Sequence, residues 1–432
     1  MANALLAAVA TLLTLAIAEV FLRVAAPVSD PFESDKSFRY QNQYIRSAFR
    51  PHTRLETEAE EGLPGLSGKH VFTTNNLGFR GDSLAQPKPL GEYRVFMIGG
   101  STVECFYLDD AQTITAVLQR TLAGRVPGRA VKVYNAGKSG DKSDDHISML
   151  AHRLVHLEPD LVIVMMGLND LRASIAGFDY QHFDPRPAFT SAAGPPPLGL
   201  RRLFNLAATQ FQLPRRVYYA AKRLRPRSAQ EIRETITLRS SVRVKAEKVQ
   251  RLPIAARRPR ADTAAFRRNV ETLIGIAAGH RVPLVFVTHP VTWNAGDSII
   301  SRWQWMRAVG DDAFRADQMA AALDELNAAT RAAAERGAVP VFDLASSVSR
   351  STEHFYDDAH FNVAGAEAAG QALAKFLAGL ALPGLTAPES DADECKQRPW
   401  DQLANPSVPD NAAFSFARAR KGGDFYCWFG QM

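Results

Sequence analysis

Short apolar runs alternate along the chain with longer segments in which apolar positions recur every three or four residues. The runs are rich in Val, Ile, Phe and Met and cover residues 94–100, 130–137, 159–167, 282–290 and 339–345. Apolar runs without polar alternation predict strands that are buried on both faces, as in a parallel sheet. The segments with helical spacing are 111–125, 146–157, 264–281, 317–338 and 363–380. We therefore predict the α/β class, with a three-layer α/β/α sandwich around a five-stranded parallel sheet.

Two regions interrupt this alternation. Residues 25–92 are punctuated by Pro and Gly and show no sustained period, and the stretch 73–82 predicts a turn between short extended pieces. A basic insertion at about 171–260 separates the third predicted strand from the next helix. The predicted organisation is an N-terminal apolar segment (1–24), an extension (25–92), the α/β domain with its insertion (93–381), and a C-terminal tail (382–432).

The N-terminal segment from Ala4 to Leu22 is apolar except for two threonines and Glu19. As a helix it would span about 28 Å, close to the thickness of a bilayer core. Three interpretations are open. Its length and the terminal Arg23 favour a retained membrane anchor, which is our prediction. The small residues at 16 and 18 suit a cleaved signal peptide, although the first three residues carry no basic charge. A buried helix of a soluble protein is the third.

Charge is unevenly distributed. The chain carries a net charge of +6, but residues 201–260 contain 17 Lys and Arg against 3 Asp and Glu. Two interpretations are open: a solvated helical excursion, or a basic amphipathic element that contacts anionic lipid or a protein or polymer partner. No recognition motif accompanies the charge, so we expect no nucleic-acid partner. Three cysteines make no disulfide framework, although Cys395 and Cys427 allow one bond in an oxidising compartment.

Residues that could take part in catalysis follow the predicted strands directly after each strand ends. They are Ser101, Gly137 and Asn169 after the first three strands, and Asp357 and His360 before the last helix. Because the carboxyl ends of parallel strands meet at one edge of the sheet, we expect these residues to lie close together.

A serine hydroxyl becomes a nucleophile when a base takes its proton, and His360 is the candidate base for Ser101. Asp357 lies three residues before His360, on the same side of a helical turn, where its carboxylate would orient the imidazole and stabilise its charged form. Asp358 is the alternative partner, but it is one residue out of that register. These residues predict a Ser-His-Asp triad.

An oxyanion needs donors aimed at it, and the candidates are the N–H groups of Ser101 and Gly137 and the side-chain amide of Asn169. Other residues have weaker signals. Cys105 is interpreted as a packing thiol. His289 follows a predicted strand end, where it could line the pocket, and neither His289 nor His354 has an identifiable partner. The glycines before Ser101 lack the third glycine of a dinucleotide fingerprint, and there is no P-loop. No cluster has metal-ligand spacing. We expect no cofactor and no metal.

Four blocks of the sequence resemble those of the SGNH hydrolases, also called GDSL-type esterases. They are GGST, NAG, GLND and DDAH, within residues 94–380. The resemblance implies a flavodoxin-like fold, a catalytic triad of Ser101, His360 and Asp357, and an oxyanion hole of Ser101, Gly137 and Asn169. Gly100 stands where the family name has Asp. Glycine is common there in membrane-tethered bacterial members, which the apolar N-terminal helix and NNLGFRG also resemble.

The resemblance implies a serine esterase that hydrolyses an O-acyl ester, above all O-acetyl, on a glycan or polysaccharide. It also implies a bacterial inner-membrane protein whose catalytic domain lies in the periplasm. Two alternatives remain. The same triad serves an O-acyltransferase, in which a sugar hydroxyl replaces water. A membrane-tethered scaffold or polysaccharide-binding subunit would use the basic insertion to hold partners, but the intact triad argues against it.

Overall fold

The computed structural model describes residues 2–28, 38–40, 44–126, 128–178, 203–204, 207–208, 210–221, 236–239, 241–294, 296–380, 382–385, 420–421 and 424–425. At its centre is a five-stranded sheet in the order β12-β9-β7-β5-β6, in which every neighbouring pair is parallel. The strands are β5 (Glu92–Gly99), β6 (Ala130–Asn135), β7 (Leu161–Met165), β9 (Leu284–Val287) and β12 (Val341–Phe342). In chain order the arrangement is 2-1-3-4-5, which is flavodoxin-like. The predicted fold class is confirmed.

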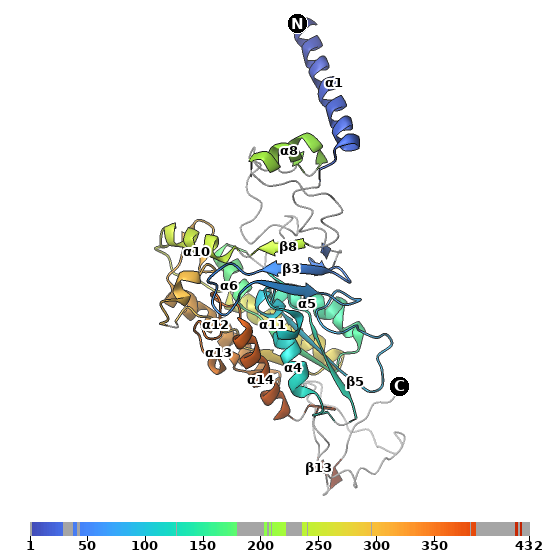
Figure 1. The fold of residues 1–432 in the computed structure, drawn as a ribbon. Helices are drawn as coiled ribbons and strands as arrows, with labels where there is room; N and C mark the ends of the chain where they lie inside the picture. Colours follow the sequence, from blue (N-terminus) through green and yellow to red (C-terminus); the bar gives the residue numbers. More distant parts are fainter. Residues whose placement is uncertain are drawn as a thin grey trace.

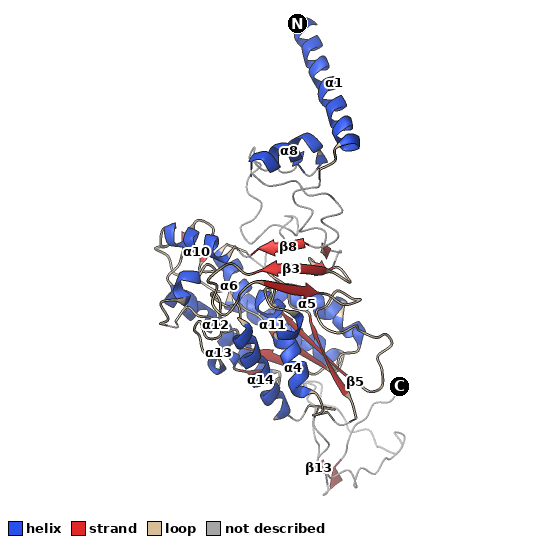
Figure 2. Ribbon diagram, in the orientation of Figure 1, coloured by secondary structure: helices blue, strands red, loops and turns tan. Residues whose placement is uncertain are grey.

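The sheet is covered on both faces, which explains why its strands lack polar alternation. All eight residues of β5 are buried. Successive side chains point to opposite faces, so Phe96 and Ile98 join one core while Val95 and Met97 join the other. The first core includes helices α5 (Ser143–His152), α11 (Thr263–Gly279) and α12 (Ala316–Arg336), and the second includes α4 (Ile114–Leu122) and α14 (Val363–Ala378) (Figure 2). The three predicted layers are therefore present.

Two predicted elements end earlier than expected. The helix predicted over 146–157 stops at His152, and a 3-10 turn, η2 (Leu154–Leu157), completes the segment. The last strand, predicted over 339–345, consists of Val341–Phe342. It ends because Asp343 accepts hydrogen bonds from the hydroxyls of Thr288 and Ser346 and the chain turns into α13 (Leu344–Ser347).

A second sheet joins the two regions that the sequence analysis kept separate. Strands β3 (Arg54–Glu58) and β4 (Lys69–Thr73) of the extension form an antiparallel pair. From the insertion, β8 (Ile236–Arg239) adds to β3 in parallel (Figure 1). The insertion therefore returns to the domain, and α10 (Val242–Arg251) follows this strand directly. In addition, α6 (Leu168–Ile175) occupies the first residues assigned to the insertion.

The remaining elements are short. They are β1 (Arg39–Tyr40), β2 (Ala48–Phe49), α3 (Ser101–Glu104), η1 (Asp110–Gln112), η3 (Ile300–Trp303), β10 (Ala308–Val309), β11 (Asp312–Ala313), β13 (Arg420–Lys421) and β14 (Asp424–Phe425). Cys395 and Cys427, between which the sequence allows one disulfide bond, lie outside the described residues.

The N-terminal helix α1 (Ala2–Ala25) extends away from the α/β domain (Figure 1). Its segment Leu5–Ala25 is 21 residues long and has a mean hydropathy of 2.4, and none of it is buried by the rest of the protein. It is therefore long and apolar enough to cross a membrane. Helix α8 (Gln212–Ala221) of the insertion lies at its C-terminal end. Length and composition suit either a membrane anchor or a signal sequence. The absence of burial is at odds with the buried-helix interpretation.

Candidate active site

Close packing explains why two glycines stand at the end of the first strand. β5 ends at Gly99, and the chain turns at Gly100 into α3, which begins with Ser101. A Cβ on Gly99 would lie 2.3 Å from Cγ2 of Val103, and one on Gly100 would lie 2.7 Å from Nδ2 of Asn169. Both distances are shorter than any real contact. The glycines therefore let Ser101 stand at the carboxyl edge of the sheet with the Asn169 amide beside it.

Ser101, His360 and Asp357 form a continuous chain of hydrogen bonds. Nε2 of His360 lies 2.7 Å from Oγ of Ser101, although 259 residues separate them. Nδ1 of His360 lies 2.8 Å from both carboxylate oxygens of Asp357. This arrangement suits the tautomer in which Nδ1–H donates to the carboxylate and Nε2 accepts from the serine hydroxyl. The structure brings all three predicted triad residues together.

The local geometry between Asp357 and His360 differs from the prediction. The segment is a bend and not a helical turn. The Asp357 carboxylate accepts the N–H groups of Ala359 and His360 at 3.1 and 3.0 Å, and Oδ2 accepts from Nε1 of Trp305 at 2.9 Å. These donors hold the carboxylate in place and draw the imidazole toward it. The side chains meet because the carboxylate organises the turn, and not because of helical register.

Asp358, the alternative partner, is engaged elsewhere. Its carboxylate accepts from Nε1 of Trp293 at 2.6 Å and from the N–H groups of Trp305 and Met306 at 2.5 and 2.9 Å. Burial, together with the neighbouring Asp357 charge, raises the pKa of Asp358 to about 6. Asp358 therefore anchors the loop that carries Trp305, and His360 pairs with Asp357.

The electrostatic environment favours the ionised carboxylate of Asp357 together with the protonated imidazole of His360. Burial opposes the charged imidazole, but the charge and hydrogen bond of Asp357 outweigh it and raise the pKa of His360. Burial also opposes ionisation of Asp357, but His360 and the other donors outweigh it and lower the pKa of that carboxyl. An imidazole whose protonated form is stabilised in this way is a stronger base toward a serine hydroxyl.

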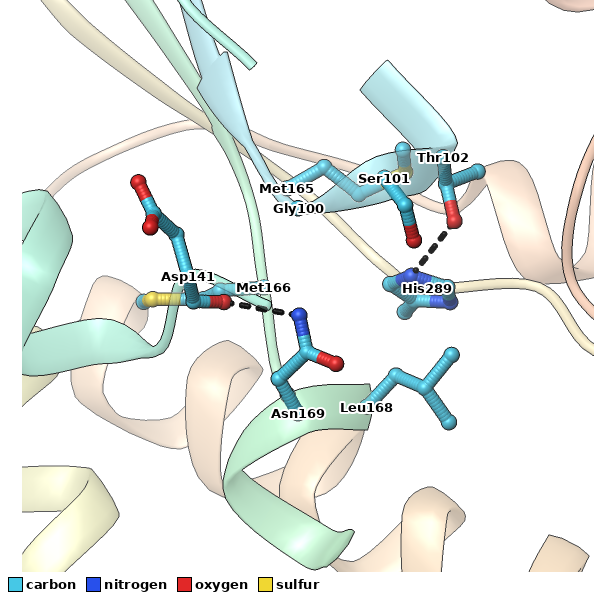
Figure 3. A pocket seen from close by; sticks show the side chains of 10 residues that line it. Gly100, Ser101, Thr102, Asp141, Met165, Met166, Leu168, Asn169 and His289 are labelled. Atoms are coloured by element: carbon cyan, nitrogen blue, oxygen red, sulfur yellow. Dashed lines mark hydrogen bonds between the residues drawn. The ribbon is translucent and has the colours of Figure 1, made fainter. Parts of the chain in front are cut away.

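The third strand end contributes Asn169. Gly167 starts α6 with a φ of 117°, a conformation that favours glycine, and so turns the chain sharply after β7. Nδ2 of Asn169 donates to the carbonyl oxygen of Asp141 at 2.9 Å, and Asn169 lines a pocket together with Ser101 (Figure 3). The second hydrogen of this amide has no acceptor within the described residues and is available to an oxyanion.

The structure places Gly137 away from this pocket, contrary to the prediction. Its N–H donates to Oδ1 of Asn135 at 2.9 Å, and a Cβ would lie 2.6 Å from the backbone nitrogen of Glu104. Gly137 is therefore a packing glycine beneath α3, with its donor already satisfied. The same loop continues to Gly140, which is exposed, has a φ of 85° and directly precedes the pocket-lining Asp141.

The pocket beside Ser101 is small and has both polar and apolar walls. The space inside it, open solvent included, is about 220 Å³, and its walls include Met165, Met166, Leu168 and His289. The pocket therefore suits a short group.

The sequence of the chain matches the model of a known protein family. The model of the GDSL-like Lipase/Acylhydrolase family matches residues 81–368. The chain belongs to this family. This GDSL-type protein is a serine ester hydrolase.

Several solved structures resemble this GDSL-type chain. The acetylxylan esterase from Geobacillus stearothermophilus has 13% sequence identity and a TM-score of 0.37, over 69% of this chain and 99% of that chain. The lipase/acylhydrolase from Enterococcus faecalis has 16% identity and a TM-score of 0.36, over 66% and 96%. The aryl esterase from M. smegmatis has 15% identity and a TM-score of 0.36, over 66% and 97%. No curated protein matches the chain.

Residues with weaker sequence signals have structural explanations in this GDSL-type site. His289 lines the pocket, as the sequence suggested; Nδ1–H donates to the carbonyl of Pro290, and Nε2 accepts from the Thr102 hydroxyl at 3.2 Å. Burial lowers its pKa to about 4, so the ring is neutral. Burial raises the pKa of the Cys105 thiol to about 11, consistent with a packing role. His354 accepts from the N–H of Ser349. Among the described residues, no group of three or more His, Cys, Asp or Glu is placed to hold a metal ion.

Sequence reasoning missed the residues of the extension that hold the loop at 138–141. Arg46 donates from Nη2 to the carbonyl oxygen of Gly140 at 3.0 Å and to Asp145 at 2.7 Å. Buried Glu104 accepts from the N–H and hydroxyl of Ser139, and Arg39 lies 3.5 Å from the same carboxylate. No spacing rule connects an arginine at 46 with a loop 90 residues later, so no local signal marks this role.

Proposed function

We propose that this chain hydrolyses an O-acyl ester through an acyl-enzyme on Ser101. The observation that carries the proposal is the hydrogen-bonded chain from the Ser101 hydroxyl through His360 to Asp357. As Oγ bonds to the ester carbonyl carbon, Nε2 of His360 takes the hydroxyl proton, and the carbonyl electrons move to oxygen. Collapse of this intermediate breaks the bond to the alcohol, which leaves with the proton from His360.

A water molecule completes the cycle. His360 takes one of its protons as the water oxygen attacks the acyl carbon, and the returning proton restores the Ser101 hydroxyl while the carboxylic acid leaves. Throughout, Asp357 holds the imidazole in one tautomer and stabilises its positive charge. The donors from Trp305, Ala359 and His360 itself keep the carboxylate in the orientation that this role requires.

The negative charge on the tetrahedral oxygen needs donors already in place. We assign the Ser101 N–H and Nδ2 of Asn169 to this role, because both lie at the pocket and each has a free hydrogen within the described residues. The third donor is the N–H of Gly140 in place of that of Gly137, because the latter is occupied by Asn135. Loss of one such donor costs about 2.7–4 kcal/mol of transition-state stabilisation.

We further propose that the acyl group is acetyl and that the alcohol belongs to a glycan. The small pocket walled by Met166, Leu168 and His289 supports a short acyl chain. The ring of Trp305 lies parallel to that of His360 at a centroid distance of 6.5 Å, and Trp303 and Trp305 are both partly exposed. Amphipathic rings of this kind offer an apolar face to a sugar ring and a polar edge to its hydroxyls.

The decisive test compares the wild-type chain with Ser101→Ala on 4-nitrophenyl acetate, together with labelling by a fluorophosphonate. We expect the variant to lose at least a thousandfold in kcat and all labelling, while circular dichroism and Tm stay unchanged. The conservative control is Ser83→Ala, an exposed serine of the N-terminal extension that the mechanism does not use. Equal rates for the wild type and Ser101→Ala would refute the nucleophile assignment.

We also propose that α1 is a retained anchor and that the domain lies outside the cytoplasm. Glu19 is the one carboxylate in the apolar segment, and it accepts the N–H groups of Gln212 and Leu213 at the start of α8. Arg23 pairs with Glu19 at 2.7 Å and donates to the carbonyl of Gln210. The polar atoms of α1 are thus satisfied where the helix would leave the bilayer. Export signals and anchors share an apolar core, and either would direct the domain across the membrane.

Helix α8, at the C-terminal end of this anchor, has the residue pattern of a helix that lies in the membrane interface. Leu213 and Val217 are 40% and 49% exposed and lie one turn apart on the same side. Arg215 and Arg216, by contrast, donate to the carbonyls of Val28 and Ala26. An exposed apolar stripe with basic neighbours is typical of a helix that lies in the headgroup region.

Two measurements test the membrane placement. Mass spectrometry of the purified chain from alkali-washed membranes should find residues 1–18 intact; a mature chain that begins at Glu19 would overturn the anchor proposal. A spin label at Val217→Cys, in a background without Cys395 and Cys427, should be more accessible to oxygen than to aqueous nickel in lipid nanodiscs. The control is Leu90→Cys, which is fully exposed on the α/β domain. Equal accessibility at both positions would contradict the interfacial assignment of α8.

A further inference from the structure

Helix α10 carries a cation from the basic insertion to the catalytic triad. The helix packs beside η3, and Nζ of Lys245 lies 4.4 Å from the centre of the Trp305 ring. That indole donates to Asp357, and its ring is parallel to the His360 ring within 12°, at a centroid distance of 6.5 Å. The ammonium group is therefore one aromatic ring away from the general base.

A second cation reaches the same indole from α6. The guanidinium carbon of Arg172 lies 5.5 Å from the centre of the Trp305 ring, and Nη1 donates to the carbonyl of Met306. Within the described residues, neither Arg172 nor Lys245 forms an ion pair with a carboxylate. Two positive charges therefore lie close to one ring at the edge of the active site.

The nearby carboxylates are already engaged. Asp357 and Asp358 are fully buried, and each accepts several hydrogen bonds from its own surroundings. Glu60 accepts the backbone N–H of Arg243 at the start of α10. Partial burial lowers the pKa of Lys245, and the Asp357 and Glu60 charges oppose that effect without contacting the ammonium. Although its ammonium is partly desolvated, Lys245 retains an exposed surface, so a ligand can reach it.

The chemistry constrains where the alcohol part of the substrate begins. His360 must deliver a proton to the leaving oxygen, so that oxygen lies within hydrogen-bond reach of Nε2. The acyl group occupies the pocket on the side of Leu168 and His289. An alcohol that extends past His360 on the side of Trp305 reaches the ammonium of Lys245, because the Trp305 ring lies parallel to the imidazole and Nζ lies 4.4 Å from the centre of that ring.

We propose that Lys245 binds an anionic group on the alcohol part of the ester, namely the carboxylate of an acidic sugar. This inference rests on the proposed esterase function and adds the substrate class. Lys245 acts as a specificity residue: it contacts the substrate at a position remote from the reacting bond, while Arg172 adds to the positive potential. An ammonium held over an indole is partly desolvated, which strengthens its bond to a carboxylate.

The test uses two esters that differ by one carboxylate: mono-acetylated methyl glucoside and mono-acetylated methyl glucuronoside. The full chain in detergent is assayed as wild type, Lys245→Gln and Lys248→Gln, the last being an exposed lysine on the same helix that contacts none of the site residues. We expect the wild type and Lys248→Gln to prefer the glucuronoside by about tenfold in kcat/KM, the size of one charge-assisted contact. In Lys245→Gln this ratio should fall to about one, and in the wild type it should shrink as salt rises.

The outcomes separate the inference from the function on which it rests. A wild-type ratio near one, with hydrolysis that depends on Ser101, would overturn the inference and leave the esterase intact. An equal fall for both esters in Lys245→Gln, together with a shift of the pH midpoint, would show that Lys245 acts through Trp305 on the triad and does not bind substrate. If Ser101→Ala hydrolyses both esters as fast as the wild type, the proposed function itself fails.

Discussion

Replacement of Asp357 by Asn tests the core of the mechanism with almost no change of shape. Two backbone N–H groups, from Ala359 and His360, point at Oδ1, and the indole N–H of Trp305 points at Oδ2. An amide must therefore keep its oxygen at the Oδ1 position and place its NH2 at the Oδ2 position. That NH2 would lie about 2.8 Å from Nδ1 of His360, where Oδ2 is now.

This NH2 reverses the hydrogen-bond pattern of the imidazole. Nδ1 then lies 2.8 Å from this donor and 2.8 Å from the amide oxygen at the Oδ1 position, but that oxygen already accepts two backbone N–H groups. The NH2 donor therefore favours the tautomer in which Nδ1 accepts and the ring proton moves to Nε2. Nε2 then faces the Ser101 hydroxyl as a donor and cannot take its proton. The stabilising charge is lost as well. For a triad that has lost this carboxylate we expect kcat to fall by about 10⁴-fold, which corresponds to about 5 kcal/mol.

Asp358→Asn is the matched control, because it makes the same change one residue away. Its amide oxygen can keep the N–H groups of Trp305 and Met306 and loses only the indole of Trp293. We expect a cost of about 1–3 kcal/mol in the free energy of unfolding and a kcat within about tenfold of the wild type. Both variants are assayed on 4-nitrophenyl acetate with Tm measured in parallel. A kcat within tenfold for Asp357→Asn, or a 10⁴-fold loss for Asp358→Asn, would refute the assignment.

Three further predictions concern the general base His360, the pocket beside Ser101 and the loop at 138–141 that carries Gly140. Because the pKa of His360 is raised, the imidazolium persists to higher pH, and kcat/KM should climb with pH through a midpoint above the ordinary 6.5; a midpoint at or below 6.5 contradicts this. Leu168→Ala should raise the butyrate-to-acetate ratio of kcat/KM by about tenfold, whereas an unchanged ratio would show that Leu168 does not bound the acyl group. Arg46→Ala removes the bonds to Gly140 and Asp145 and should lower kcat by about tenfold or more, with Arg46→Lys intermediate; an unaffected kcat would mean that the loop holds itself.

Much of the fold is predictable because its strands are buried on both faces. A strand such as 159–167 must be apolar throughout, so its signal is local and does not depend on its neighbours. The ends of elements are less predictable, since they depend on single polar contacts. Asp343 ends the last strand by accepting hydrogen bonds from the hydroxyls of Thr288 and Ser346. The pattern of apolar residues around position 343 predicts neither of these hydrogen bonds.

The active site divides in the same way. Ser101 and Asn169 follow recognisable strands, so their positions at the sheet edge follow from the parallel arrangement. Gly137 was wrongly predicted to supply a donor, because the sequence does not show that Asn135 reaches around to occupy its N–H. The choice between Asp357 and Asp358 rested on helical register, and the structure provides a different reason, a carboxylate-centred bend.

The sequence by itself determined the α/β class, the order of the strands along the chain and the residues that end them, because periodicity and glycine chemistry act over a few residues. Only the tertiary structure decided which donors are free, which carboxylate faces the imidazole, and that β8 returns the insertion to the domain and α10 brings Lys245 over Trp305. Those outcomes depend on contacts across tens to hundreds of residues, as between Ser101 and His360. Such contacts form only when the whole chain has packed, and no local pattern records them.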